Sequence, residues 1–301
     1  MTMQRFVAIG ECMIEMSGGQ DGHWKMGIAG DTLNTAWHFR NATNDRDWQV
    51  RYVTALGDDR YSDRIARFIS DAGIDTSAIQ RLSGNRPGLY LIDQENGDRV
   101  FTYWRENSAA RKMADDIAAL ESALLGADVI YLSGITLAIL SEDRRTALIE
   151  IIKARPKQTR IAFDPNIRPA LWQDRDSCKR VLSDVAAISD IILPSFDDEA
   201  TLFGDATPEE TVMRYRDLGV AEIVVKNGGG PCFFRHDGQV ESVQTPPVSK
   251  VVDATGAGDS FNAAFLAARL SGADTGNAIQ SGQVLSAKVI QTHGALLTGG
   301  E

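Results

Sequence analysis

Short apolar runs rich in β-branched residues alternate along this chain with longer segments in which apolar residues recur every three or four positions. The runs FVAIG, DVIYLSG, RIAFDPN and EIVVKNG are typical of buried strands, whereas SDRIARFISDAG and SEDRRTALIEIIKAR are typical of amphipathic helices. This alternation predicts an α/β fold, a mostly parallel sheet with helices on both faces. Because the sequence contains no repeat and no Pro/Ser-rich linker, we expect residues 1–301 to form a single domain.

Polar residues follow directly after several of the predicted strands. They stand in DPNIR (164–168), PSFDDE (194–199) and KNGGG (226–230). Ligands of open α/β sheets bind beyond the carboxyl ends of the strands. The pattern therefore predicts the binding site at this edge.

One region departs from the alternation. Residues 85–107 read as two strands around an Asn-Gly turn at Asn96 and Gly97, which is a strong hairpin signal. A further strand candidate, ECMIEMSG, lies at residues 11–18. We expect residues of about 11–27 and 85–107 to form a small second sheet, a lid over the ligand edge.

Composition narrows the classes of function. The chain has 31 basic and 41 acidic residues, a net charge of −10, which disfavours nucleic acid as a partner. Cys12, Cys178 and Cys232 are far apart and show no CxxC spacing, so neither a disulfide framework nor a zinc site is indicated. Neither a secretory leader nor a run of membrane-spanning length is present, and we expect a cytoplasmic protein.

The stretch VVDATGAGDSFNAAFLAARL (251–270) carries the strongest chemical signal. Gly256, Ala257 and Gly258 form a tight turn into a predicted helix, and backbone N–H groups at such a start bind anions. The carboxylate of Asp259 would compete with a phosphate for these N–H groups, which suggests that it has a chemical task of its own, to accept a proton. The alternative is that Asp259 is an ordinary cap of the helix. The chain contains no Gly-Lys pair of a P-loop, and GAGDSF lacks the third glycine of a dinucleotide fingerprint, which disfavours NAD.

Four motifs together resemble one known family. AGDTLNTA (29–36), DPNIR (164–168), KNGGG (226–230) and DATGAGDSFN (253–262) resemble, in order and spacing, the ribokinase-like or PfkB family of carbohydrate kinases. The resemblance implies a three-layer sandwich with a sheet lid, and ATP-dependent phosphorylation of a sugar hydroxyl. It implies Asp259 as the catalytic base and the N–H groups of Gly256, Ala257 and Gly258 as the anion hole.

The same resemblance assigns the nucleotide and metal residues. The residues implied for ATP are Asn166, Lys226, Asn227, Gly228, Gly230, Gly256, Gly258 and Gln283. Where the family often has Asn-x-x-Glu for Mg²⁺, this chain has Ser195 and Asp198, so Asp198 or its neighbour Glu199 is expected to substitute. The alternative is an acidic run that caps a helix. A monovalent cation such as K⁺ is implied near Asp253, Thr255 and Gly294.

The acceptor is expected to be a sugar acid. GDTLNTA, YWRE and DPNIRPALW resemble the subgroup whose acceptor is 2-keto-3-deoxygluconate. A carboxylate favours forked cations, for which Arg105 and Arg168 are the candidates. The other residues expected to contact the sugar are Gly30, Asp31, Asn34, Tyr90, Tyr103 and Asp259.

Alternatives remain open for the acceptor and for the assembly. The arginines could be surface residues and the tyrosines lid packing, in which case a neutral sugar such as fructose or ribose is the acceptor. Gluconate-type and galactonate-type keto acids both fit the spacing. An exposed lid sheet is expected to be buried against a partner, and the resemblance implies a homodimer formed through the lid.

Overall fold

The computed structural model describes residues 3–18, 22–95 and 98–297. Its centre is an eight-stranded sheet in the order β14-β13-β12-β11-β10-β9-β1-β4. These strands are β1 (Gln4–Ile9), β4 (Trp48–Val53), β9 (Val129–Ser133), β10 (Arg160–Asp164), β11 (Ile191–Ile192), β12 (Glu222–Val225), β13 (Cys232–His236) and β14 (Gln239–Val243). The strands from β4 to β12 pair in parallel, and β13 and β14 add an antiparallel edge. The expected mostly parallel sheet is confirmed.

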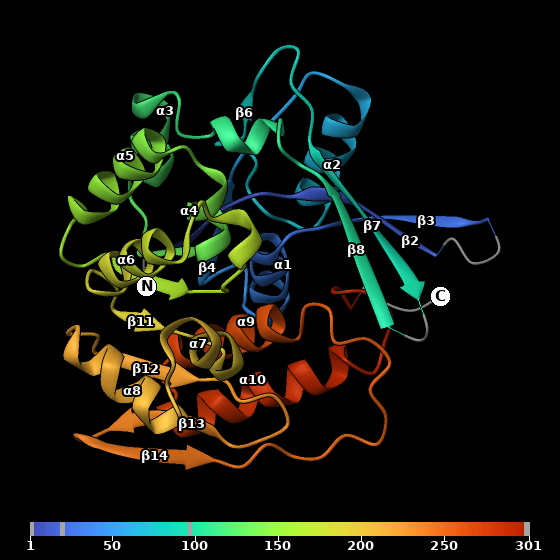
Figure 1. The fold of residues 1–301 in the computed structure, drawn as a ribbon. Helices are drawn as coiled ribbons and strands as arrows, with labels where there is room; N and C mark the ends of the chain where they lie inside the picture. The colour runs from blue at the N-terminus through green and yellow to red at the C-terminus, as the bar shows by residue number, and fades with distance from the viewer. Residues whose placement is uncertain (1–2, 19–21, 96–97, 298–301) are drawn as a thin grey trace.

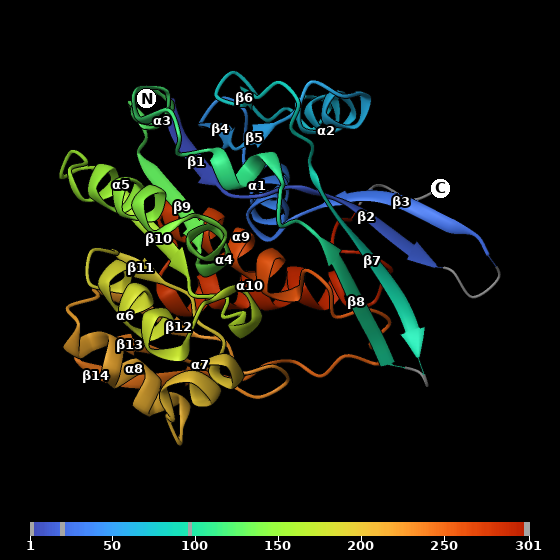
Figure 2. The ribbon, with the colours of Figure 1, turned by 45° about the horizontal axis from the view of Figure 1, so that its top comes forward.

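Helices cover both faces of this sheet (Figures 1 and 2). One face carries α1 (Asp31–Ala42), α2 (Arg60–Asp71), α9 (Ala257–Leu270) and α10 (Thr275–Val289). The other carries α3 (Ile117–Leu124), α4 (Gly134–Ile139), α5 (Glu142–Lys153), α6 (Arg175–Ala186), α7 (Phe196–Phe203) and α8 (Pro208–Asp217). Alternate residues of β1 supply the two cores, with Phe6 and Ala8 on the first side and Val7 and Ile9 on the second.

The second sheet has four strands in the order β3-β2-β7-β8. They are β2 (Met13–Gly18), β3 (Trp24–Ala29), β7 (Gly88–Glu95) and β8 (Asp98–Trp104), and in Figure 1 they project from the body of the molecule. The segments from residues 11–27 and 85–107 thus pair in one sheet, with β2 parallel to β7. The turn expected at Asn96 and Gly97 lies outside the described residues.

Smaller features complete the body. β5 (Ala55–Leu56) pairs with β6 (Gln80–Arg81), and 3-10 turns lie at Ala109–Lys112 and Pro169–Leu171. Cys12, Cys178 and Cys232 are all free and buried. Within the described residues, no helix combines the length and the apolar character that crossing a membrane requires.

Candidate active site

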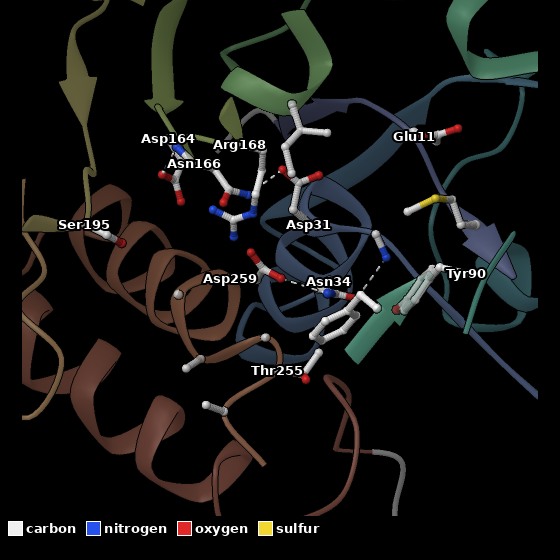
Figure 3. A pocket seen from close by; sticks show the side chains of 18 of the residues that line it. Glu11, Asp31, Asn34, Tyr90, Asp164, Asn166, Arg168, Ser195, Thr255 and Asp259 are labelled. Carbon is white, nitrogen blue, oxygen red and sulfur yellow. Dashed lines mark hydrogen bonds between the residues drawn. The ribbon is translucent and has the colours of Figure 1, made fainter. Parts of the chain in front are cut away.

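A cavity of about 650 Å³ lies at the carboxyl ends of the central strands, between the body and the second sheet (Figure 3). We call its two sides the body wall, which includes the starts of α1 and α9, and the lid wall, which includes β7, β8 and the residues that follow β1. The sequence candidates that line it are Gly30, Asp31, Asn34, Tyr90, Tyr103, Arg105, Asn166, Arg168, Asp198, Lys226, Thr255, Gly256, Ala257, Gly258 and Asp259. Four motifs that are far apart in the chain therefore meet in one cavity.

The turn before α9 requires glycine. Gly256 has a φ of 75°, in the left-handed region that L side chains rarely adopt. A Cβ built on Gly256 would lie 2.6 Å from the Cβ of Ala295 and 2.8 Å from its Cα. α9 begins at Ala257, and Gly256, Ala257 and Gly258 all line the cavity. The first N–H groups of a helix lack partners within the helix, although that of Ala257 donates to the backbone oxygen of Ala254 at 3.2 Å. This arrangement suits a bound anion.

Asp259 lies in the first turn of α9 and accepts a hydrogen bond of 2.8 Å from Asn34 Nδ2 (Figure 3). Burial raises the pKa of Asp259 well above the usual range of an aspartate. The negative charge of Asp31 raises this pKa further, while the hydrogen bond from Asn34 opposes the rise. A carboxylate in such surroundings has a high proton affinity, which a general base requires near neutral pH.

Asp31 and Asn166 form one unit on the body wall. Asn166 Nδ2 donates a hydrogen bond of 2.8 Å to Asp31 Oδ2, and the backbone N–H of Thr32 donates to Asp31 Oδ1. Asn166 has a φ of 33°, which its short amide side chain tolerates better than a larger side chain would. The family resemblance implied that Asn166 binds the nucleotide. In the structure the Asn166 amide contacts Asp31, a residue that is expected to bind the sugar.

Lys226 lies beneath the start of α9. Its Nζ donates to Asp164 Oδ2 at 2.9 Å and to Asn262 Oδ1 at 3.0 Å. A Cβ on Gly258 would lie 3.5 Å from the same Nζ. The ammonium therefore adds positive charge next to the helix start, and Asp164 and Asn262 hold it there.

Both candidate arginines pair with acidic residues that line the same cavity. Arg105 Nη2 donates to Glu11 Oε2, and the two residues are 7% and 2% exposed. Arg168 Nη1 lies 3.4 Å from Asp198 Oδ2, and the Arg168 side chain is 51% exposed. One ion pair is therefore buried and the other partly exposed.

The aromatic residues of the lid wall contact one another, Phe101 and Tyr103 in a stacked arrangement and Tyr90 at a tilt to both. Tyr90, Phe101 and Tyr103 form neighbouring ring contacts with centroids 5.6 to 6.4 Å apart. The hydroxyl of Tyr90 donates to Glu15 Oε2. Tyr90 therefore offers the cavity its ring, whereas the half-exposed Tyr103 lines the cavity from β8.

Some candidates do not line this cavity. Asn227, Gly228 and Gly230 lie in the turn after β12, where Gly228 has a φ of 52°. Gln283 is 5% exposed, and its Nε2 donates to Thr245 Oγ1 at 3.0 Å, so its amide points to the loop after β14. Asp253 accepts from the backbone N–H of Gly294 at 2.7 Å, which brings together the two segments expected to hold a monovalent cation.

Glu199 requires a correction. Its side chain is fully buried and accepts hydrogen bonds from Arg214 Nη2 at 2.7 Å and from the hydroxyl of Tyr215 at 2.9 Å. The helical turn of α7 directs Glu199 into the core beside α8, whereas its neighbour Asp198 faces the cavity. The expectation that Glu199 is a magnesium residue is therefore wrong.

Sequence reasoning missed residues on both walls. Glu11, Met13 and Phe101 line the lid wall, and Asp164 lines the body wall. Glu11 and Asp164 could have been found by the rule used above, because Glu11 lies two residues after the end of β1 and Asp164 ends β10. No signal marked Phe101, whose strand alternation alone does not say which face meets the cavity.

Metal binding by the protein alone has little support. In the part of the chain that the structure describes, no three His, Cys, Asp or Glu side chains are grouped to hold a metal ion. Mg²⁺ bound with phosphates needs only one or two carboxylates from the protein. Asp198, which faces the cavity near Lys226 and Asp164, fits that smaller role.

The molecule has an α/β body, a second sheet beside a cavity, and a carboxylate at a helix start within that cavity. These features define a ribokinase-like fold with a site of the phosphoryl-transfer type. The model of the pfkB family of carbohydrate kinases matches residues 3–298. The chain belongs to that family.

Relatives and solved structures agree with this assignment. A 2-dehydro-3-deoxygluconokinase of Dickeya dadantii (strain 3937) is 38% identical over 99% of this chain and 98% of its own length. One of Escherichia coli (strain K12) is 37% identical over 98% of this chain and 97% of its own. An E. coli structure in complex with ATP and Mg²⁺ has a TM-score of 0.84 at 24% identity, covering 98% of this chain and 94% of that one.

Proposed function

We propose that the protein is an ATP-dependent sugar-acid kinase that phosphorylates 2-keto-3-deoxygluconate (2-dehydro-3-deoxy-D-gluconate) at its 6-hydroxyl. The observation that carries the proposal is one cavity with a raised-pKa aspartate at a helix start on one wall and a buried arginine on the other. The relatives named 2-dehydro-3-deoxygluconokinase, at 37 to 38% identity over nearly the full length, support this substrate.

The body wall performs the chemical step. Asp259 accepts the proton of the sugar hydroxyl as its oxygen attacks the terminal phosphorus of ATP, and the bond from that phosphorus to the ADP oxygen breaks. Backbone N–H groups of Gly256, Ala257 and Gly258 stabilise the charge on the transferring phosphoryl oxygens. Lys226 adds positive charge beside them, since its Nζ lies close to Gly258. Asn34 orients Asp259 through its hydrogen bond.

The lid wall and the rim of the cavity bind the acceptor. Arg105 and Arg168 bind the carboxylate, because forked guanidinium groups suit a planar anion. Asp31 accepts from sugar hydroxyls, held in place by Asn166. Tyr90, Phe101 and Tyr103 form an apolar wall against the carbon chain, which also excludes water from the reacting centre.

ATP is the phosphoryl donor, and Asp198 would hold Mg²⁺ together with the phosphates of ATP. Mg²⁺ neutralises charge on the phosphate oxygens when bound. The turn of Asn227, Gly228 and Gly230 borders the nucleotide outside the cavity. K⁺ binds at the segments that Asp253 and Gly294 bring together, and Thr255 on the cavity side of that loop belongs to the same site.

The described chain acts as one domain with a lid that pairs with a second copy. Val100 and Trp104 of β8 are 38% and 51% exposed, and Trp24 of β3 is 37% exposed. Such apolar side chains on a projecting sheet favour a homodimer through the lid. Size-exclusion chromatography with light scattering tests the assembly.

A coupled assay of ADP release tests the function. The purified protein is incubated with ATP, Mg²⁺ and 2-keto-3-deoxygluconate, and in parallel with fructose or ribose. We expect turnover with the keto acid and a kcat/KM for either neutral sugar lower by at least about tenfold, the loss expected for one missing charge-assisted contact. Equal or better turnover with a neutral sugar would refute the sugar-acid assignment.

A further inference from the structure

Glu11 is an acidic residue on the lid wall that the proposed chemical step does not use. It lies two residues after the end of β1, is 2% exposed and lines the cavity. Its Oε2 accepts from Nη2 of Arg105, which itself follows directly after β8. The pair therefore joins the first strand of the body to the last strand of the second sheet.

Glu11 has almost no freedom to move. A Cβ on Gly88, the first residue of β7, would lie 2.9 Å from Glu11 Oε1. A Cβ on Gly30 would lie 2.2 Å from the backbone oxygen of Glu11. A side chain at Gly88 or Gly30 would therefore collide with Glu11. The Glu11 carboxylate is enclosed between the body and β7.

Arg105 uses only part of its hydrogen-bonding capacity. Among the described residues, its Nη2 has Glu11 as partner, whereas its Nε is buried without a hydrogen-bond partner. The Arg105 guanidinium carbon also lies 5.8 Å from the centre of the Tyr103 ring. Since an unpaired buried guanidinium is strongly unfavourable, Glu11 supplies the charge that keeps Arg105 in this wall when no ligand is bound.

We propose that Glu11 is a positioning residue that sets the affinity for the acceptor. It holds one edge of the Arg105 guanidinium, so that the remaining N–H groups meet the carboxylate of a sugar acid in a fixed orientation. This rests on the proposed function, because it requires an anionic acceptor. Arg168 is held differently: its side chain is 51% exposed, and its Nη1 lies 3.4 Å from Asp198 Oδ2 and donates to the backbone oxygen of Ile167 at 2.7 Å.

The test is a double-mutant cycle read in KM. Glu11→Ala, Arg105→Ala and the double variant are compared with the unmodified enzyme, with 2-keto-3-deoxygluconate and ATP varied in turn. Glu11→Ala should raise the KM for the keto acid about tenfold, the value of one charge-assisted contact, and leave the KM for ATP unchanged. In the Arg105→Ala background the same change should alter KM by less than about twofold.

Two further variants separate positioning from general damage. Glu11→Gln keeps an oxygen that accepts from Nη2 but lacks the charge, so its KM for the keto acid should lie between those of the unmodified enzyme and Glu11→Ala. Asp75→Asn removes another partly buried ion pair, that of Arg51 Nε with Asp75 Oδ2 at 2.8 Å, and should leave both KM values unchanged. If Glu11→Ala does not fold, Gly88→Ala displaces the same carboxylate and should raise the KM for the keto acid only while Arg105 is present.

The outcomes are distinct. No turnover of the keto acid by the unmodified enzyme would refute the proposed function itself. With an active enzyme, an unchanged KM in Glu11→Ala, an effect of equal size in the Arg105→Ala background, or an equal rise in the KM for ATP would overturn the positioning role.

Discussion

The two walls of the cavity are built on different principles. The body wall gathers four carboxylates, those of Asp31, Asp164, Asp198 and Asp259, around Lys226 and the start of α9. The lid wall gathers aromatic rings around one buried ion pair, Arg105 with Glu11. The first arrangement raises the proton affinity of Asp259, and in the proposed mechanism it serves the chemical step, whereas the second selects the acceptor. Changes at Asp259 and the start of α9 should therefore appear in kcat, and changes to the lid wall in the KM for the sugar acid.

The largest effect is expected for Asp259→Asn on the body wall. It removes the group that accepts the hydroxyl proton, and kcat should fall by about 10²- to 10⁴-fold, the usual contribution of a general base. Steady-state kinetics with saturating ATP and keto acid measure it. Binding of the keto acid, followed by calorimetry, is the control and should persist. A kcat within a few-fold of the unmodified enzyme would remove Asp259 from the mechanism.

The same variant should be more stable at neutral pH. The pKa of Asp259 is higher in the folded protein than in the unfolded chain, because burial disfavours the charged form. The folded state then binds the proton more tightly, so stability falls as pH rises from the unfolded towards the folded pKa. Asp259→Asn avoids that loss and should raise the Tm at pH 7 relative to the unmodified protein, with a smaller difference at pH 4.

On the lid wall, Arg105→Ala should raise the KM for the keto acid by roughly ten- to a hundredfold. The guanidinium is buried, and a charge-assisted hydrogen bond there is worth about 1.5–3 kcal/mol. The KM for ATP, measured in the same assay, should not change. A variant with an unaltered KM for the keto acid would mean that the carboxylate is bound elsewhere.

Arg168→Ala tests whether an exposed arginine contributes less than the buried Arg105, because the Arg168 side chain is 51% exposed. Solvent screens an exposed pair, which is worth about 0.2–1 kcal/mol, so the KM for the keto acid should rise only about two- to fivefold. Kinetics of the two arginine variants side by side give the ratio. Equal effects at the two arginines would contradict the distinction between a buried and an exposed anchor.

The smallest effect concerns pH. The charge of Asp31 raises the pKa of Asp259, so Asp31→Asn should lower that pKa and move the acid limb of kcat/KM to lower pH. A shift of a few tenths to about one pH unit is expected for one like charge nearby. The midpoint of the limb is the readout, since Asp31→Asn also weakens binding. A limb that stays in place or moves to higher pH would contradict the coupling.

The difference between the walls also explains what sequence reasoning could reach. Gly256 to Asp259 form a local unit, a turn into a helix, which glycine spacing and the helical pattern that follows indicate from the sequence. Asp31 and Asn34 likewise lie within the first turn of α1. Arg105 was found by its charge, but its partner Glu11 lies 94 residues away, and local patterns carry no information about such a pair.

For other candidates, the orientation of a helix decides whether the side chain faces the cavity. Asp198 and Glu199 are adjacent, and composition makes them equal candidates. The orientation of α7 sends one into the cavity and the other into an ion pair with Arg214. Packing also decides the orientation of Gln283. Because α10 packs beside β14, the Gln283 amide points to Thr245.

By itself, the sequence determined the mostly parallel sheet with helices on both faces, the departure at residues 85–107, and the glycine turn before Asp259, because periodicity and turn chemistry act over a few residues. The tertiary structure alone decided which charges meet: Glu11 with Arg105, Asp198 with Arg168, Asp164 with Lys226, and Asp31 close enough to Asp259 to raise its pKa. The physical reason is that burial and charge proximity set proton affinity and ion-pair strength, and both exist only once distant segments have packed together.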